Sequence, residues 1–203
     1  AQPAFSNVVV LAGGVGGAKL VEGLAKVLPP EHLCVVVNTG DDFTHLGLYV
    51  CPDLDTVTYT LAGIAHRGQG WGLADETFAA LSMVETLGGP AWFRLGDRDI
   101  GTHLVRTARL SRGERLTEVT ASLTRAHGIG ARILPMCDAP RRTLVETHDE
   151  GTLDFQTWLV GHRGAPRVRA LRFEGPRDTT PEVRAALDAA DLVVIAPSNP
   201  YVS

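Results

Sequence analysis

A glycine-rich turn between an apolar run and a helical pattern is the feature that most constrains the fold. Residues 8–12 are VVVLA, an uninterrupted apolar run typical of a strand buried on both faces. The segment GGVGGAKLVEGLAKVL follows directly, with Leu20, Leu24 and Val27 at helical spacing. Two prolines end this helix, and LCVVVN supplies a second buried strand. The order strand, helix, strand predicts a right-handed βαβ unit and a parallel sheet.

The segment after the second strand is predicted to be helical. No long apolar strand occurs between Asp41 and about residue 115, and three segments there begin with an acidic N-cap candidate and end at glycine: DLDTVTYTLAG, DETFAALSMVETLG and DIGTHLVRTARLSRG. A further helix is expected around 117–126. We therefore predict one Rossmann-like domain over residues 1–203, a three-layer α/β fold with a mainly parallel sheet and a mainly helical insertion at about 41–128.

The remaining strands are expected to bring the chain back to the sheet. ARILPM, RTLVET, a short segment near Phe155 and RVRALRF have strand patterns, and PEVRAALDAA is a proline-initiated amphipathic helix. LVVIA is another buried strand and leads into PSNP. Because such a strand normally continues into another helix, we expect a C-terminal part of the fold to be missing after Ser203.

Composition excludes several classes of partner. The chain of 203 residues has a formal charge of −4 and a pI near 6.0, so no global field attracts nucleic acid or an anionic membrane. Any anionic ligand must be held by local donors. The apolar N-terminal run is interrupted by glycines and a lysine, unlike a signal peptide or a membrane span. Three scattered cysteines suit a reducing compartment, and we expect a cytoplasmic protein.

The glycine turn is a candidate phosphate site. Its glycines are Gly13, Gly14, Gly16 and Gly17. They allow close backbone approach and direct helix N–H groups at a phosphate or diphosphate. A P-loop would have Gly and Ser or Thr where this chain has Ala18 and Leu20. A dinucleotide fingerprint would have Gly or Ala at the position of Lys19. Lys19 lies in the first helical turn, where a cation is unfavourable unless an anion is near. A tight turn without ligand and a solvated lysine are the alternatives.

Polar residues follow the second strand in the order Asn38-Thr39-Gly40-Asp41-Asp42. The carboxyl ends of parallel strands are where ligands bind in open α/β sheets. Two adjacent carboxylates there could hold Mg²⁺, completed by substrate phosphates and water. The alternative is an aspartate pair that only caps a turn.

Two further acidic segments accompany predicted helix starts. Asp53 and Asp55 follow a proline, and one of the two is expected to be a simple cap. In LGDRD, a structural role is expected for Asp99, whereas Asp97 stays open between structure and function. The aromatic residues of the predicted insertion could stack on a flat heterocycle or fill a core: Tyr59, Trp71, Trp92 and Phe93.

Eight segments, taken in order along the chain, resemble the 2-phospho-L-lactate transferase family of coenzyme F-420 biosynthesis. They are LAGGVGGAKLVEGL, VVVNTGDD, GLYVCPDLDTVTYTLAG, WGLADETF, WFRLGDRDIGTHLVRT, LPMCD, FQTWLV and APSNP. The resemblance runs from about Val8 to Pro200. It implies a Mg²⁺-dependent reaction on the deazaflavin Fo (7,8-didemethyl-8-hydroxy-5-deazariboflavin). The ribityl hydroxyl of Fo attacks a guanosine diphosphate ester of lactate or phosphoenolpyruvate, which forms a phosphodiester and releases GMP.

The resemblance also implies roles for residues, and a homodimer. Asp41 and Asp42 would hold the metal or assist the attacking hydroxyl. The phosphates and nucleotide would contact the four glycines, Lys19, Asn38, Ser198 and Asn199. The deazaflavin would lie against Asp53, Tyr59, Trp71 and Asp97. The chain departs from the family pattern at Ala196, where the family has glycine before PSNP.

Two other classes remain to be distinguished. A regulatory protein that binds nucleotide sugars shares the glycine turn and the aspartate pair, but CPDLDTVTYTLAG and LGDRD argue against it. An NAD-dependent oxidoreductase would need an acidic residue at the end of the second strand, where Asn38 stands.

Overall fold

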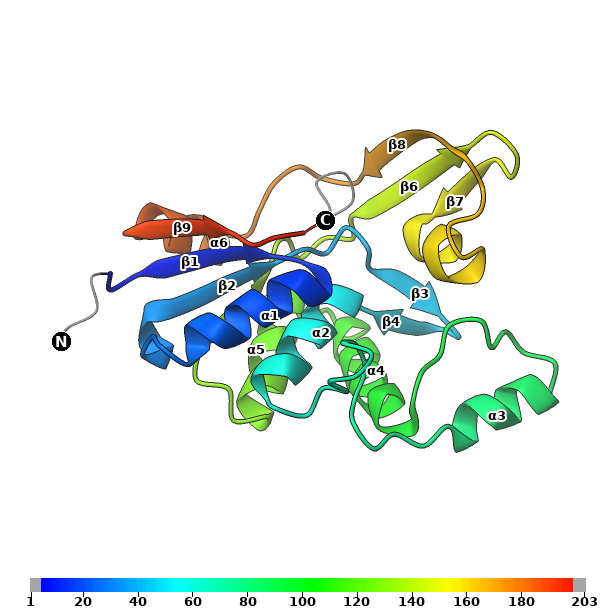
Figure 1. Cartoon of the computed structure of the whole chain (residues 1–203), viewed down its shortest axis with the longest axis horizontal. Coiled ribbons are helices and arrows are strands. Elements are labelled where there is room, and N and C mark those ends of the chain that lie inside the picture. The colour runs from blue at the N-terminus through cyan, green and yellow to red at the C-terminus, as the bar shows by residue number, and fades with distance from the viewer. Residues whose placement is uncertain (1–4, 199–203) are drawn as a thin grey trace.

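The computed structural model describes residues 5–198. Its central sheet has four parallel strands in the order β5-β2-β1-β9 (Figure 1). Their bounds are Val8–Ala12 for β1, Leu33–Val37 for β2, Arg132–Pro135 for β5 and Leu192–Ile195 for β9. Val10 of β1 pairs with Val35 on one side and Val194 on the other. The predicted parallel sheet and βαβ unit are confirmed.

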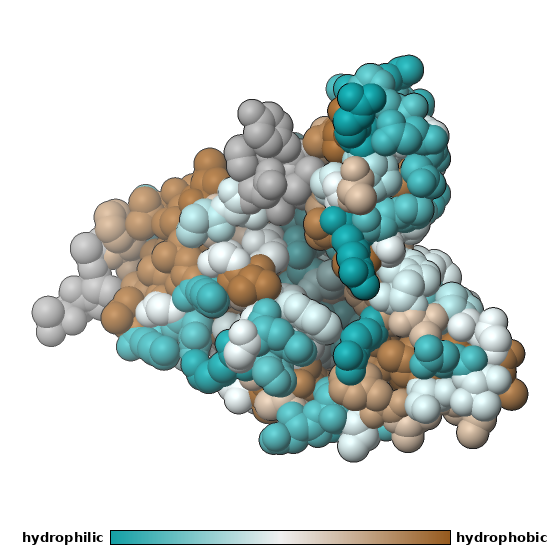
Figure 2. All heavy atoms as spheres, turned by 45° about the vertical axis from the view of Figure 1, so that its right-hand side comes forward, coloured by the Kyte–Doolittle hydropathy of each residue, from teal (hydrophilic) through white to brown (hydrophobic). Residues whose placement is uncertain are grey.

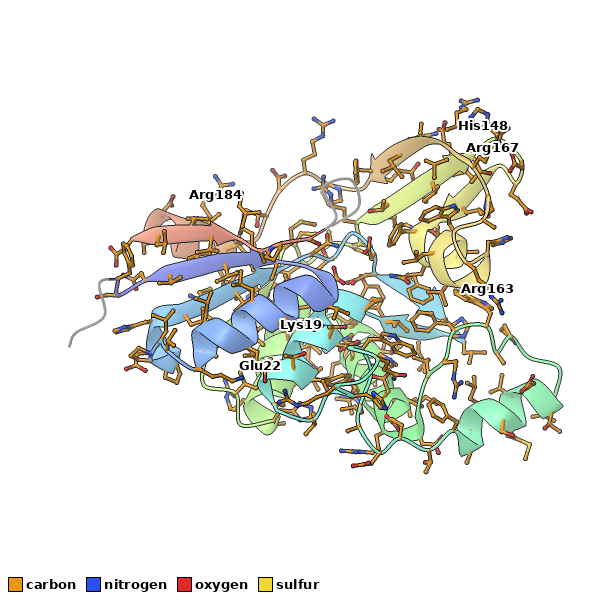
Figure 3. The ribbon with its side chains drawn as sticks, viewed as in Figure 1. Lys19, Glu22, His148, Arg163, Arg167 and Arg184 are labelled. Atoms are coloured by element: carbon orange, nitrogen blue, oxygen red, sulfur yellow. The ribbon has the colours of Figure 1, made fainter. Side chains whose placement is uncertain are left out.

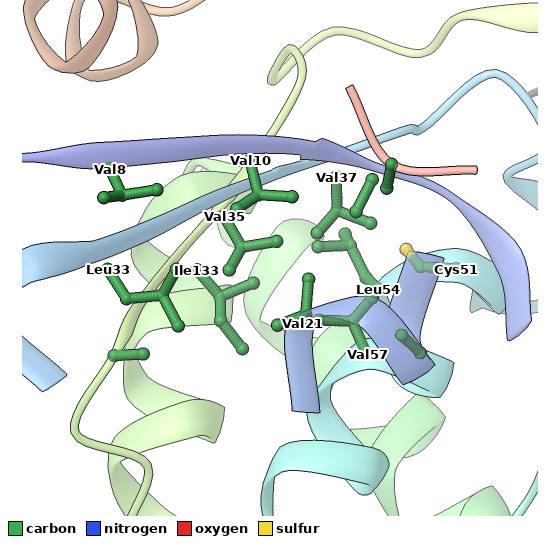
Figure 4. Close-up of a cluster of buried hydrophobic side chains, with 14 of the residues drawn as sticks. Val8, Val10, Val21, Leu33, Val35, Val37, Cys51, Leu54, Val57 and Ile133 are labelled. Carbon is green, nitrogen blue, oxygen red and sulfur yellow. The ribbon is translucent and has the colours of Figure 1, made fainter. Parts of the chain in front are cut away.

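Helices cover both faces of this sheet. One face carries α1 (Gly14–Ala25), α2 (Pro52–Leu61) and α5 (Leu116–Ala126), and the other carries α6 (Pro181–Asp188). Val10 and Val35 are fully buried in one cluster with Val21 of α1 and Leu54 of α2 (Figure 4). Alternate strand residues face the opposite way, and Val9 packs there in a cluster with α6. The three-layer α/β fold is therefore confirmed.

The segment predicted as a helical insertion contains the expected helices and one unexpected hairpin. Its other helices are α3 (Ala79–Thr86) and α4 (Asp97–Leu110), and its hairpin pairs β3 (Phe43–His45) with β4 (Leu48–Val50). Each of these strands has three residues, too few to show an alternating pattern in the sequence. Because α2 and α5 pack directly on the sheet beside α1, they belong to the main helical layer.

The prediction that RTLVET and RVRALRF rejoin the parallel sheet is wrong. These segments are β6 (Arg142–Thr147) and β8 (Val168–Glu174), and with β7 (Thr152–Asp154) they form a separate antiparallel sheet in the order β7-β6-β8. Most side chains of β8 are exposed. An antiparallel sheet tolerates a solvated face, whereas a parallel sheet is buried on both faces.

The three-stranded sheet forms a lobe that projects beyond the central sheet (Figure 1). A π-helical turn at Thr157–Gly161 follows β7, and a short 3-10 helix at Pro30–His32 precedes β2. Figure 2 shows the hydrophilic surface of the lobe and a hollow between it and the helical part of the molecule. The backbone N–H of Thr143 donates to the carbonyl of Gly40 at 2.7 Å. This bond connects the lobe to the loop that follows β2.

Candidate functional site

The glycine turn brings three chain segments into close contact. Gly13 is the extended N-cap residue of α1, and Gly14 begins the helix with a φ of +60°. A Cβ on Gly17 would lie 3.2 Å from the Cβ of Ala12, and one on Gly16 would lie 2.7 Å from the carbonyl oxygen of Pro197. The N-cap residue Gly13 has no side chain that could cap the first turn of α1. Beyond the N–H of Gly14, which bonds Asp53, the first N–H groups therefore form an anion-binding end at the edge of the sheet.

Two glycine substitutions in α1 should separate this close approach from helix stability. Gly16→Ala is expected to destabilise the protein by about 1–3 kcal/mol and to raise the KM for the phosphate-bearing substrate, because its methyl group meets a backbone oxygen. Gly23→Ala is the matched control, since no atom lies within 4 Å of its added Cβ. It should stabilise the protein by about 0.5–1 kcal/mol. Urea unfolding and steady-state kinetics measure both effects, and an unchanged Gly16→Ala enzyme would contradict the contact.

Asn38, Asp53 and Ser198 meet beside this turn. The side-chain amide of Asn38 donates to Asp53 Oδ2 at 3.0 Å, and its carbonyl oxygen accepts from Gly40 N at 2.9 Å. Ser198 Oγ lies 3.5 Å from the carbonyl oxygen of Gly13. Burial raises the pKa of Asp53, and bonds from Asn38 and the Gly14 backbone oppose that rise. The ends of β1, β2 and β9 thus converge with the start of α2. Asn199 lies outside the described residues.

The predicted acidic pair is buried and poorly satisfied. Asp41 and Asp42 are each 6% exposed. Three of their oxygens have no hydrogen-bond partner: Asp41 Oδ1, Asp42 Oδ1 and Asp42 Oδ2. Burial, and then the charge of Asp53, raise the pKa of Asp41 to about 8. Burial also raises the pKa of Asp42, against a weaker opposing effect of Cys51. Unpaired carboxylates that are costly to ionise fit a divalent cation, which prefers such oxygen ligands.

An aromatic cavity adjoins the acidic pair. Its volume is about 400 Å³, within the usual range for a small-molecule site. The predicted ligand-contacting residues Asp53, Tyr59 and Trp71 line it, together with Gly14 of the glycine turn. Gln156 lines both this cavity and the small recess that contains Asp41 and Asp42. The aromatic cavity therefore adjoins the glycine turn through Gly14 and the acidic pair through Gln156.

Aromatic rings form one wall of the cavity. Trp92 and Phe93 line it with their ring centroids 5.6 Å apart, and Phe43 of β3 packs edge-on to Phe93 at 4.9 Å. His45 lies behind them, 5.1 Å from the ring of Trp92. The unexpected hairpin therefore supports the wall. Trp92 and Phe93 pack against neighbouring rings and also line the cavity, and their stacking on a heterocycle stays a prediction.

A buried charged network forms another wall, and sequence reasoning did not anticipate it. Arg106 is 2% exposed and binds both carboxylate oxygens of Asp55. It also bonds His103 Nδ1 at 3.0 Å, and His103 Nε2 lies 3.4 Å from Asp99 Oδ1. Tyr59 donates its hydroxyl to Asp99 at 2.6 Å. The spacing of Asp99, His103 and Arg106 places them on one face of α4, which was the signal available in the sequence.

The carboxylates and imidazole of this network also lie close enough to hold a metal ion: Asp55, Asp99 and His103. Both oxygens of Asp55 are already occupied by the guanidinium of Arg106. That guanidinium supplies the positive charge that a cation would otherwise bring. The unpartnered oxygens of Asp41 and Asp42 fit a divalent cation better.

Two predicted contact residues lie apart from the aromatic cavity. Lys19 is on the side of α1 that faces α2 and lines a separate shallow cavity of about 90 Å³ (Figure 3). The carboxylate of Asp97 accepts from the backbone N–H groups of Ala79 and Ala80 at 3.0 and 2.9 Å. It therefore caps the start of α3, and the hydrogen bond from the Thr77 hydroxyl, followed by those from the α3 backbone, lowers its pKa.

Within residues 5–198, no helix combines the length and apolarity that crossing a bilayer requires. Solved structures of a UPF0052 family protein from Bacillus halodurans share the fold. One superposes with a TM-score of 0.60 at 18% identity, over 98% of this chain and 60% of that one. At that level of identity the likeness concerns the fold alone.

Sequence relatives carry transferase names. A Kitasatospora aureofaciens protein named phosphoenolpyruvate transferase is 46% identical over 97% of this chain, and one from Streptomyces griseus is 44% identical over 97%. A 2-phospho-L-lactate transferase from Methanosarcina mazei is 39% identical over 96%. The chain covers 64%, 64% and 65% of these three proteins, so it spans less than two thirds of their length. The model of the family 2-phospho-L-lactate transferase CofD matches residues 8–203. The glycine turn, the acidic pair Asp41 and Asp42 and the start of α2 all lie inside that match, and the chain belongs to the 2-phospho-L-lactate transferase family.

Proposed function

We propose that this protein transfers a phospholactyl or phosphoenolpyruvyl group from a guanosine diphosphate ester to the ribityl hydroxyl of Fo, with release of GMP, in coenzyme F-420 biosynthesis. The observation that supports this most directly is the continuity of three subsites at one edge of the sheet. An anion-binding helix end, a buried pair of unpartnered carboxylates and an aromatic cavity adjoin one another. Each suits one part of the two substrates.

The glycine turn suits the diphosphate of the donor. The N-cap residue Gly13 leaves the N–H groups after Gly14 without a side-chain cap, and the positive end of the helix dipole favours an anion there. Ser198 is beside the turn and could contact the nucleotide, as could Asn199 directly after it. Lys19, one helical turn further on, would contribute a positive charge at longer range.

The aromatic cavity suits the flat ring system of Fo. Tyr59 and Trp71 would lie against the rings. Asp53 lines the same cavity, and its negative charge contributes to the raised pKa of Asp41. A ribityl chain that passes Asp53 would therefore present its terminal hydroxyl to the acidic pair.

The reaction requires positioning and charge neutralisation more than covalent participation of the protein. The hydroxyl oxygen of Fo attacks the phosphorus that carries lactate or enolpyruvate, and the bond from that phosphorus to the GMP oxygen breaks. The hydroxyl proton passes to a carboxylate of the acidic group. Burial raises the pKa values of Asp42 and Asp53, and it raises the pKa of Asp41 to about 8, which suits Asp41 to exchange a proton near neutral pH. Mg²⁺ held by Asp41 and Asp42 would neutralise charge on the diphosphate.

Product formation tests the proposal directly. We expect GMP and the Fo phosphodiester, detected by mass spectrometry, when the protein is mixed with Fo, Mg²⁺ and either guanosine diphosphate ester. The enolpyruvyl donor should give the higher kcat/KM, because the relatives named phosphoenolpyruvate transferase are 43–46% identical and those named 2-phospho-L-lactate transferase 38–39%. Absence of product with both donors, together with tight binding of a nucleotide sugar, would instead support a regulatory protein.

A further inference from the structure

Asp99 lies where the aromatic cavity meets a second cavity. The second cavity has a volume of about 370 Å³ and shares Trp71, Gly72, Arg94 and Asp99 with the first. The side chain of Asp99 is 13% exposed, so it is largely buried but still reaches the cavity surface. A carboxylate at such a junction is accessible to a bound ligand and shielded from bulk water.

The two oxygens of Asp99 have different surroundings. Oδ1 accepts the Tyr59 hydroxyl at 2.6 Å and faces His103 Nε2 at 3.4 Å. Throughout the described chain, the hydrogen bonds to this carboxylate all go to Oδ1. Oδ2 therefore keeps its full capacity to accept a hydrogen bond from a ligand.

The network behind Asp99 fixes the direction of its side chain. An arginine can only donate, so His103 Nδ1 must accept from Arg106 and the imidazole proton must be on Nε2, facing Asp99. Glu76 accepts from the backbone N–H of Asp99 at 2.8 Å and holds the start of α4. Burial alone would raise the pKa of Asp99, but the adjacent His103 imidazole and the hydrogen bond from Tyr59 hold that pKa below its ordinary value. The side chain is therefore an oriented carboxylate that only accepts.

We propose that Asp99 determines ligand specificity by accepting, through Oδ2, the ring N–H of a planar heterocycle bound between the aromatic residues. Fo carries such a donor in the imide N–H of its pyrimidinedione ring, so the inference rests on the proposed function and adds the residue that recognises one edge of the rings. The same carboxylate repels an ionised hydroxyl, so it disfavours the reversed orientation in which the 8-hydroxyl edge faces α4.

Binding of Fo and of Fo methylated at the imide nitrogen tests this inference. Wild-type protein should bind Fo about ten- to a hundredfold more tightly than the methylated compound, measured by deazaflavin fluorescence, since methylation removes a hydrogen bond to a charged acceptor. Asp99→Asn places an amide donor in the position of Oδ2 or breaks the bond to Tyr59. It should weaken Fo binding by about tenfold or more and reduce the preference to below about threefold. The exposed control Asp188→Asn on α6 should keep the wild-type preference.

The outcomes are distinguishable from a failure of the proposed function. Equal wild-type affinity for Fo and the methylated compound overturns the role of Asp99 while leaving Fo binding intact, and it requires no variant to fold. A wild-type preference retained by Asp99→Asn overturns the role as well. Absence of any Fo binding by the wild-type protein overturns the proposed function, and the role of Asp99 with it.

Discussion

An Asp41→Asn protein is expected to lose transferase activity by about 100- to 1000-fold and yet to resist urea better than the wild type at pH 9. The activity falls because a charge that would hold the cation or accept the proton is lost. The stability rises because the wild-type carboxylate is buried with one unpartnered oxygen. Replacing it with a neutral amide should add about 4–6 kcal/mol to the free energy of unfolding at high pH, because each unit of the rise in the Asp41 pKa corresponds to about 1.4 kcal/mol.

The pH dependence of this stability difference has a definite sign. The ordinary pKa of Asp41 is 3.8 and its folded value is about 8, so the folded state binds more protons than the unfolded state between these values. The free energy of unfolding of the wild type should therefore fall as pH rises from about 4 to 8. The difference from Asp41→Asn should be small at pH 4 and largest above pH 8. Urea titrations without metal at pH 4, 7 and 9 measure it.

Metal addition provides an independent readout. Mg²⁺ should raise the urea midpoint of the wild type and leave that of Asp41→Asn nearly unchanged. Below about pH 8, binding must displace a proton from Asp41, so the Mg²⁺ concentration needed for half of the effect should fall as pH rises from 6 to 8. Asp188→Asn, exposed on α6, is the control for both measurements. If the Asp41→Asn protein kept transferase activity within threefold of the wild type, the proposed role of Asp41 in the reaction would be wrong.

Arg106→Met is expected to destabilise the protein by about 3–5 kcal/mol. It leaves Asp55 buried without its partner, and the lost Coulomb energy exceeds the gain from not burying the guanidinium. Asp55 draws the pKa of Arg106 above its ordinary value, opposing the effect of burial, so the arginine is charged in the folded protein. Equilibrium urea unfolding measures the change.

A double variant makes the interpretation specific. Asp55→Asn combined with Arg106→Met removes both charges and should recover much of the lost stability, since the cost arises from an unpaired buried charge. Arg109→Met on the same helix breaks a half-buried pair with Glu114, which solvent still reaches, and should change stability far less. Equal losses for Arg106→Met and Arg109→Met would mean that burial of the pair has no energetic consequence.

Local pattern was sufficient for the framework of this protein. The apolar run before the glycine turn, the helical spacing after it and the second apolar run predict the βαβ unit, which the structure confirms. The glycines and the two aspartates after β2 could be placed at the carboxyl edge of the sheet for the same reason. These features depend on residues within a few positions of one another, and strand order in a right-handed unit places them on one edge.

The strand patterns did not determine sheet membership. RTLVET and RVRALRF would be strands in the central parallel sheet or in a separate antiparallel sheet. Which sheet they join depends on whether solvent reaches one face of each strand, as it does for β8. Lys19 and Asp97 show the same limit for side chains. The local sequence predicted a phosphate contact for Lys19 and left Asp97 open between structure and function, and the deazaflavin contact of Asp97 followed from the family resemblance. Where each side chain lies depends on the packing of α1 on α2 and of α4 against α3.

The sequence by itself determined the class of fold and the family, and it predicted which residue types would meet a phosphate and a cation, because these inferences follow from short-range periodicity and contiguous motifs. Only the tertiary structure decided that Asn38 bonds Asp53 and that the β3–β4 hairpin supports the aromatic wall. It also decided that two residues of α4 bind two residues of α2: Asp99 binds Tyr59, and Arg106 binds Asp55. Spacing along a helix predicts which side chains share a face. What that face meets depends on contacts between residues 40 or more positions apart, which no local pattern encodes.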